Sequence, residues 1–246
     1  MNKYKLGKHE PRHDKRTLMF CDYVDVSKLP PVKQQVDWTS GIKDWGMMRN
    51  DEIGDCTCAG IAHSIQVWTA ANKNEITVAD SDVIKAYSDI SGYNPQTGEN
   101  DNGANELDVL NYWRNVGING HKLGAYAKLN THNIQHVKIS SDIFGVNYLG
   151  IALPNTAQGQ EVWDVVNNGG DDSIPGSWGG HCVIMVGFNV TGPLIITWGK
   201  VMQMTWAFWL AYCDEAYALF SNDWMNNDKS PEGINSQLLQ EDLRVI

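Results

Sequence analysis

The sequence contains no hydrophobic run that approaches the roughly 20 residues that a helix needs to cross a membrane. The stretch from Met1 to Thr17 also lacks the apolar region of a secretory signal peptide. We therefore expect a soluble protein without a membrane-spanning segment or an export signal, which is synthesised in the cytoplasm.

Cysteine is scarce, and its spacing excludes the common structural uses of the residue. The chain has five cysteines, none of which forms a Cys-x-x-Cys pair, and the odd number argues against a disulfide framework in favour of a reducing compartment. A zinc site built from Cys56, Cys58, His63 and Cys182 would match no known ligand spacing. We predict no metal site and no cofactor.

Basic residues are also few: 19 lysines and arginines stand against 29 acidic residues, which gives a net charge of −10. This balance excludes nucleic-acid binding through the body of the protein. The exception is residues 1–16, where six basic side chains face two acidic ones. This basic arm could be solvated, lie across its own acidic body or dock onto a neighbouring molecule.

The hydrophobic pattern changes character near the middle of the chain, and the length allows one large domain or two joined lobes. The first half is typical of helices and the second half of short buried strands. The expected helices are 56–72, one from residue 80, 106–117, 205–213 and 234–243, and the expected strands are 143–153, 182–188, 194–198 and 216–220.

Cys56 has the sequence setting of a nucleophile. It follows a Gly54-Asp55 turn and precedes residues at helical spacing, so it should occupy the first turn of a helix, capped by Asp55. The positive end of the helix favours thiolate over thiol. His181, 125 residues later in a Gly-Gly-His sequence, could serve as its base. We expect Cys56 alone among the cysteines to be both reactive and exposed in a cleft.

Other chemically active side chains have simpler explanations. Cys58 lies about 200° around the helix from Cys56 and should be core, and His63 lies about 10 Å along the helix, where a buried, partner-bonded histidine is expected. Asp171 and Asp172 are expected to be solvated turn residues or to reach the cleft rim. An aromatic cluster at helical spacing should serve packing: Trp206, Phe208, Trp209 and Tyr212.

Several short motifs resemble those of papain-like cysteine peptidases, and the resemblance covers residues 36–222. The family's opening Asp-Trp pair stands 18 residues before the nucleophile, its oxyanion-hole glutamine six residues before, and its Ser-Trp-Gly after the histidine strand. The matching residues here are Asp37-Trp38, Asn50, Gly54-Asp55-Cys56, the strand 181–188 and Thr197-Trp198-Gly199.

The resemblance also identifies departures from the family pattern. Asn50 replaces the glutamine but keeps an amide donor, and Thr57 replaces the usual tryptophan. The asparagine that should accept a hydrogen bond from Nδ1 of the histidine aligns with Ile196 or Thr197, according to the anchor used. An isoleucine side chain accepts no hydrogen bond from the ring N–H, and a threonine hydroxyl accepts one only weakly. The third member of the triad is therefore missing or substituted.

The resemblance implies an α+β fold, in which a helical lobe packs against a β-barrel-like lobe with the cleft between Cys56 and His181. The expected domains are a basic N-terminal arm (1–35), a papain-like domain (36–222, with lobes at about 36–120 and 121–222) and a C-terminal extension (223–246). It also implies a cysteine hydrolase that cleaves a peptide or a cell-wall peptide crosslink, with Cys56, His181, Asn50 and Thr197 in the site.

A second hypothesis comes from residues 212–218, which resemble small papain-like proteins of bacteriophages and prophages. About 35 residues precede Asp37-Trp38, too few for the family's usual long inhibitory propeptide. The alternative is therefore a virion structural or assembly protein that keeps the fold with little or no catalysis. It would be synthesised in a bacterial host and incorporated in a phage particle, with assembly neighbours that contact the basic arm.

Overall fold

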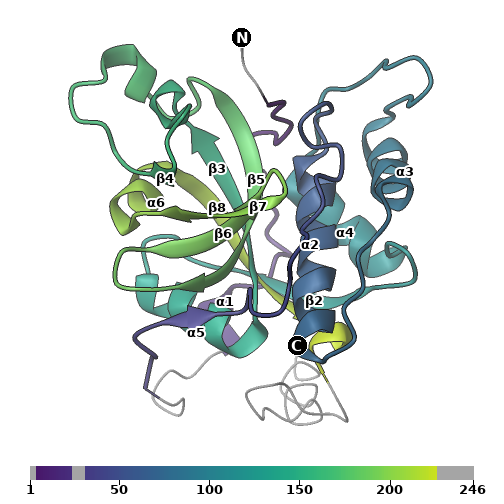
Figure 1. Cartoon of the computed structure of the whole chain (residues 1–246), viewed down its shortest axis with the longest axis horizontal. Coiled ribbons are helices and arrows are strands. Elements are labelled where there is room, and N and C mark those ends of the chain that lie inside the picture. The colour runs from purple at the N-terminus through teal and green to yellow at the C-terminus, as the bar shows by residue number, and fades with distance from the viewer. Residues whose placement is uncertain (1–3, 24–30, 226–246) are drawn as a thin grey trace.

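The computed structural model describes residues 4–23 and 31–225, with helices concentrated in the first half and strands in the second. The expected helix at 234–243 lies outside the described residues. Figure 1 shows helices α2, α3 and α4 beside the sheet. In chain order the elements are α1 (Phe20–Tyr23), β1 (Val36–Asp37), α2 (Cys56–Ala71), α3 (Asp80–Ser91), α4 (Glu106–Asn115), β2 (Leu123–Lys128), α5 (Ile134–Phe144), β3 (Asn147–Leu153), η2 (Asn155–Ala157), β4 (Val162–Trp163), η3 (Gly170–Ser173), β5 (Gly179–Phe188), β6 (Pro193–Thr197), β7 (Lys200–Met204), α6 (Trp206–Tyr212), β8 (Cys213–Ser221) and η4 (Asn222–Trp224).

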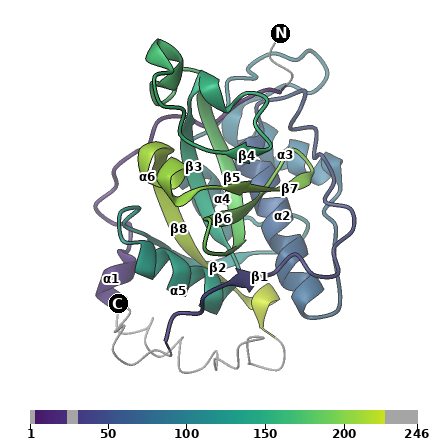
Figure 2. The same ribbon diagram turned by 60° about the vertical axis from the view of Figure 1, so that its left-hand side comes forward.

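The described strands form one mixed sheet in the order β2-β8-β3-β5-β6-β7-β4, and β1 pairs with the end of β5. Neighbouring strands are antiparallel except β4 and β7, which are parallel. The path from β2 to β4 does not close on itself, so the barrel-like lobe is an open sheet (Figure 2). None of the helices within residues 4–23 and 31–225 has the length and hydrophobicity to span a bilayer.

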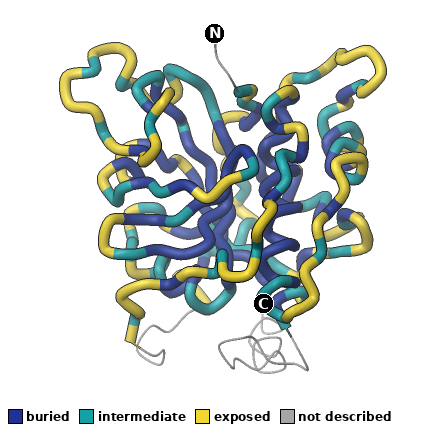
Figure 3. Tube along the Cα trace, viewed as in Figure 1, coloured by how far each residue is buried: buried dark blue, intermediate teal, exposed yellow. Residues whose placement is uncertain are grey.

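Strand β5 is covered on both faces, which explains its continuous apolar sequence. Cys182, Ile184 and Val186 belong to the core shared with α2, while Val183 and Met185 belong to the core on the opposite face. Figure 3 shows α2 and the central strands as the most buried part of the molecule. The strand that carries His181 is thus held firmly beside the helix that begins at Cys56.

The strand expected over 143–153 is wrong in its first residues. Helix α5 extends to Phe144, and strand β3 begins only at Asn147. The helix is capped by the side chain of Asn133, which accepts from the N–H of His136, and ends at Gly145 with φ 80°. The apolar end of the helix adjoins the apolar start of the strand, so the two form one run in the sequence.

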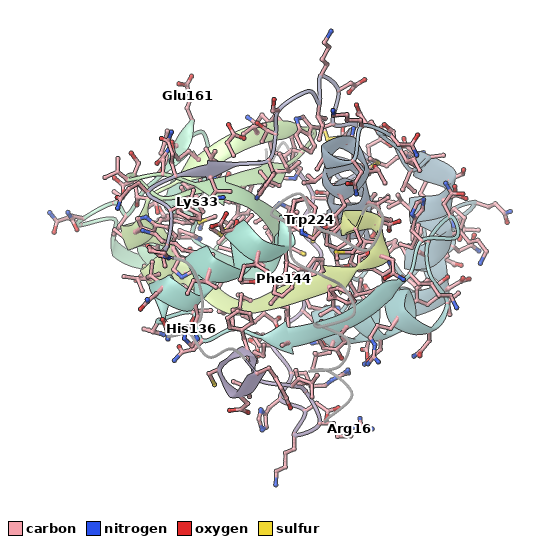
Figure 4. All side chains as sticks on the ribbon, turned by 90° about the horizontal axis from the view of Figure 1, so that it is seen from below. Arg16, Lys33, His136, Phe144, Glu161 and Trp224 are labelled. Atoms are coloured by element: carbon pink, nitrogen blue, oxygen red, sulfur yellow. The ribbon has the colours of Figure 1, made fainter. Side chains whose placement is uncertain are left out.

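Three tryptophans donate indole N–H groups to carbonyl oxygens in the last turn of α5. The last four carbonyl groups of a helix have no partner within it, so side-chain donors stabilise this end. We call these residues the tryptophan floor: Trp38 donates to Ser141 (3.1 Å), Trp68 to Phe144 (2.7 Å) and Trp224 to Ile143 (2.7 Å). Figure 4 views this end of the molecule, with Phe144 and Trp224 labelled. The floor ties the helical lobe to the sheet lobe.

Candidate active site

Helix α2 begins at Cys56, as the sequence predicted, but Asp55 does not cap it with its side chain. The Asp55 carboxylate instead accepts a hydrogen bond from the amide of Asn50 at 3.1 Å. Burial raises the pKa of Asp55 well above its usual range, while the Asn50 hydrogen bond opposes this rise. The turn before α2 is therefore fixed by a buried amide–carboxyl pair.

Cys56 is only 1% exposed. The backbone N–H of Cys182 lies 3.4 Å from its Sγ, and the N–H of Gly7 also donates to it. Burial nevertheless raises the pKa of the thiol to about 12, although both N–H groups favour the thiolate. The expectation of an exposed, thiolate-rich Cys56 is therefore wrong for this state of the chain, and Cys21 is the exposed cysteine.

His181 lies near the start of β5, where its ring is fully buried against Trp198. The two rings are stacked with centroids 4.5 Å apart and planes 14° from parallel. Nε2 lies 2.7 Å from the hydroxyl of Thr197, whereas Nδ1 is buried with no hydrogen-bond partner among the described residues. Burial lowers the His181 pKa to about 3, so the ring is neutral in this environment.

The structure distinguishes between the two alignments of the orienting residue. Thr197 contacts His181, while Ile196 is packed in the core beside α2. The contact is made to Nε2, so the expectation that the orienting group would face Nδ1 is wrong.

Asn50 follows a turn in which Met48 and Arg49 both have positive φ, 55° and 61°. Non-glycine residues rarely adopt this conformation, and strained backbone of this kind clusters at functional sites. Asn50 is buried, and its amide nitrogen is directed by Asp55. Its role at the oxyanion stays a prediction.

The basic arm forms the largest feature of the site whose position the sequence did not predict. Residues 4–10, which we call the cleft segment, run between the two lobes and over Cys56. The N–H of Lys8 donates to Gly180 at 3.0 Å, and the N–H of His9 donates to Ala104 at 3.0 Å. Ala104 in turn donates to Gly7 at 2.8 Å. The segment therefore forms backbone hydrogen bonds with both walls.

Ion pairs hold the arm across its own acidic body, one of the three arrangements that the sequence left open. Lys5 pairs with Asp101 at 2.7 Å, Arg12 with Asp108 at 2.5 Å and Lys8 with Asp214 at 3.0 Å. The opposite charge signs of the arm and the body were the sequence signal for this contact.

Glycine is required where the segment passes closest to the walls. A Cβ on Gly7 would lie 1.8 Å from the carbonyl oxygen of Gly54, and a Cβ on Gly180 would lie 2.2 Å from that of Lys8. Both obstacles are backbone atoms, which cannot move aside easily. The close fit between segment and cleft thus depends on glycine at both positions.

Most of the remaining candidates have the structural roles expected of them. Cys58 is buried, and Nε2 of His63 lies 2.9 Å from the carbonyl oxygen of Trp45. Asp172 accepts a hydrogen bond from Asn155 in an exposed turn. In the aromatic cluster Phe208, Trp209 and Tyr212 are buried on helix α6. In the part of the chain that the structure describes, no three His, Cys, Asp or Glu side chains are grouped to bind a metal ion.

No protein-family model matches the chain, and no curated protein matches it by sequence. Solved structures do resemble it. Xylellain, a cysteine protease from Xylella fastidiosa, has a TM-score of 0.69 at 16% identity, over 89% of this chain and 96% of its own. Procathepsin B S9 from Trypanosoma congolense gives 0.58 at 12% identity, over 88% and 86%. Digestive procathepsin L 3 of Tenebrio molitor gives 0.54 at 15% identity, over 80% and 72%. With its α+β architecture, this chain has the fold of the papain-like cysteine proteases.

Proposed function

We propose that this chain is a cysteine hydrolase that cleaves a peptide or peptide-like amide bond. The observation that carries the proposal is the position of Cys56 at the start of α2, with its Sγ against the N–H of the residue that follows His181. The buried contact between His181 and Thr197, covered by Trp198, supports a base whose ring orientation is fixed.

The proposed reaction begins when His181 Nδ1 takes the proton from Cys56 Sγ. The thiolate attacks the amide carbonyl carbon, and the Asn50 amide and the backbone N–H of Cys56 stabilise the oxyanion. The C–N bond breaks as the imidazolium gives its proton to the leaving amine. Water, deprotonated by His181, then attacks the thioester, releases the acid and restores the thiol.

We further propose that the cleft segment keeps this site inactive until it is displaced. It buries Cys56 and His181, and burial holds both groups in their neutral forms. A substrate has to replace the backbone hydrogen bonds that the segment makes with Gly180 and Ala104. In this proposal the backbone contacts of a few residues are enough to block the site.

Covalent labelling tests the proposed nucleophile and base. An epoxide or vinyl-sulfone probe should label the chain at Cys56 once the segment is displaced, for which we use the full-length Gly7→Ala variant. Adding Cys56→Ala should abolish labelling, and adding His181→Ala should slow it by about 10²-fold or more, because thiolate formation loses its base. Cys58→Ala is the matched control, and labelling that persists without Cys56 would contradict the proposal.

The Thr197 contact leads to a second expectation. Thr197→Val keeps the shape but leaves Nε2 without an acceptor, which should lower the rate of probe labelling in the Gly7→Ala background by about tenfold. Thr197→Asn supplies an amide acceptor and should react faster than the threonine enzyme. The pH dependence of alkylation measures both. Equal rates for all three side chains would show that Thr197 does not orient the base.

The alternative is a virion assembly protein of a bacteriophage that keeps this fold without catalysis. The same labelling experiment separates the two proposals. A Cys56 that stays unreactive after the segment is displaced favours the assembly protein, and its neighbours would then be sought among proteins that bind the basic arm.

A further inference from the structure

The side chain of Lys8 enters a pocket of its own beside the candidate active site. It is 1% exposed, and its Nζ lies 3.0 Å from Asp214 and 3.2 Å from Glu215. Gly150 forms one wall so closely that a Cβ there would lie 2.0 Å from Lys8 Cε. The pocket therefore encloses an aliphatic stem and presents carboxylates at its end.

A third carboxyl group, that of Glu106, interacts with the positive charge of Lys8. Glu106 is fully buried, and apart from the thiol of Cys182 its carboxyl group has no hydrogen-bond partner among the described residues. Its pKa is raised well above the usual range by burial and by the nearby Glu215, while the charge of Lys8 opposes this rise. Burial alone would lower the Lys8 pKa, but the attraction of the three carboxyl groups outweighs burial, so the pKa is raised.

Among the described residues, Lys8 of the arm is the positive group that acts on the three carboxyl groups of Glu106, Asp214 and Glu215. When the segment leaves, three carboxyl groups remain in a pocket that water can enter. Buried carboxyl groups that lack a cation are costly, so a cationic side chain that replaces Lys8 should be favoured strongly over a neutral one.

The position of the pocket along a bound substrate follows from the neighbouring contacts. Gly7 lies over Cys56, and the chain before it leads to Tyr4, whose ring stacks on Trp198 at 4.3 Å. Trp198 also stacks on His181. Residues before Gly7 therefore lie on the side of the base.

In the proposed reaction His181 gives its proton to the leaving amine, so the leaving group has to lie on that same side. Lys8 lies on the opposite, acyl side of Gly7. The cleft segment therefore runs in the direction opposite to that of a substrate. The Lys8 pocket should hold the second substrate residue before the cleaved bond, and Gly7 should mark the place of the first.

We infer that Glu106, Asp214 and Glu215 form a specificity subsite for a lysine or arginine side chain at the second residue before the scissile bond. This rests on the proposed hydrolase function. In this view the segment fills the cleft with its own version of the preferred side chain. An arginine could also offer additional N–H donors to the carboxyl oxygens of Glu106.

Hydrolysis of matched peptides tests the inference. The full-length Gly7→Ala variant is given fluorogenic substrates X-Gly-aminomethylcoumarin, in which X is Lys, Arg, Met or Glu. We expect kcat/KM for Lys and Arg to exceed that for Met by about 50-fold or more, because a site built for a polar group rejects analogues that lack it. Glu should be the poorest.

Variants in the pocket give the decisive comparison. Glu215→Gln should lower the ratio of kcat/KM for Lys over Met at least tenfold, and Glu106→Gln should lower it too. Asp89→Asn, on the exposed surface of α3, is the matched control and should leave the ratio unchanged. Equal use of Lys and Met by a variant that the covalent probe labels at Cys56 would overturn the inference while the hydrolase proposal stands.

Protection of Cys56 provides a measurement that needs no turnover. A synthetic peptide of residues 1–15 should slow iodoacetamide modification of Cys56 in the Gly7→Ala variant. The same peptide with Lys8→Met should give equal protection only at a concentration about 50-fold higher. Equal potency of the two peptides would overturn the subsite, whereas failure of the probe to label Cys56 would instead overturn the hydrolase proposal.

Discussion

Replacing Gly7 with alanine should raise the rate at which iodoacetamide modifies Cys56 at pH 7 by about 10²- to 10³-fold. The new Cβ would lie 1.8 Å from the Gly54 carbonyl oxygen and 2.6 Å from its Cα, so the segment cannot keep its place. Cys56 then regains water, and its pKa should fall from about 12 toward the ordinary value near 8.5 or below. Each pH unit of this fall gives tenfold more thiolate at neutral pH.

The pH profile supplies the control for that experiment. Burial raises the Cys56 pKa in the intact chain, so its alkylation rate should keep rising with pH well above 9. In the Gly7→Ala variant the rate should level off at a lower pH, since the thiol is then mostly ionised. The double variant with Cys56→Ser identifies the signal from exposed Cys21. Identical profiles for the intact chain and Gly7→Ala would show that the segment does not control the thiol.

Replacing Trp68 with alanine should destabilise the protein by about 3–5 kcal/mol, the usual cost of removing a buried aromatic side chain. Trp68 is fully buried, stacks on Trp113 at 5.7 Å and donates to the Phe144 carbonyl. The midpoint of thermal unfolding should fall by about 10 °C for a chain of this size. Calorimetry or denaturant titration of the two proteins measures the change.

A graded series separates the ring from its hydrogen bond. Trp68→Phe keeps most of the packing but leaves the Phe144 carbonyl without its donor, which should cost about 1–3 kcal/mol. Leu210→Ala, on the half-exposed face of α6, should change stability by about 0.5 kcal/mol or less. A Trp68→Ala protein as stable as the Leu210 control would refute the structural role assigned to the tryptophan floor.

The elements around the site could be predicted because their signals are local. A turn followed by helical spacing predicted the start of α2 at Cys56, and a continuous apolar run predicted the strand of His181. The boundary between α5 and β3 could not be found this way. The apolar residues before Gly145 follow the spacing of a helix and those after it the spacing of a strand, but together they form one hydrophobic stretch in the sequence.

The state of the candidate site was less accessible from sequence, because it depends on contacts between residues distant in the chain. The helix end at Cys56 argued for a thiolate, yet Gly7 and its neighbours bury the sulfur and reverse that preference. The opposite charges of arm and body indicated a contact without fixing its place. The pairing of Lys8 with Glu215, 207 residues apart, has no local sequence signal.

The tryptophan floor also determines how the two lobes can move apart. It fastens them at one end of α2, while Cys56 is at the other end, 12 residues before Trp68. At 1.5 Å per residue that distance is about 18 Å, so a rotation of only about 10° around the floor would shift the thiol by about 3 Å. The floor would thus act as a pivot and α2 as its lever arm, once the contacts that Tyr148 and Cys182 make with the Cys56 end of the helix give way. Such a rocking motion would open the cleft around the segment and leave the indole hydrogen bonds intact.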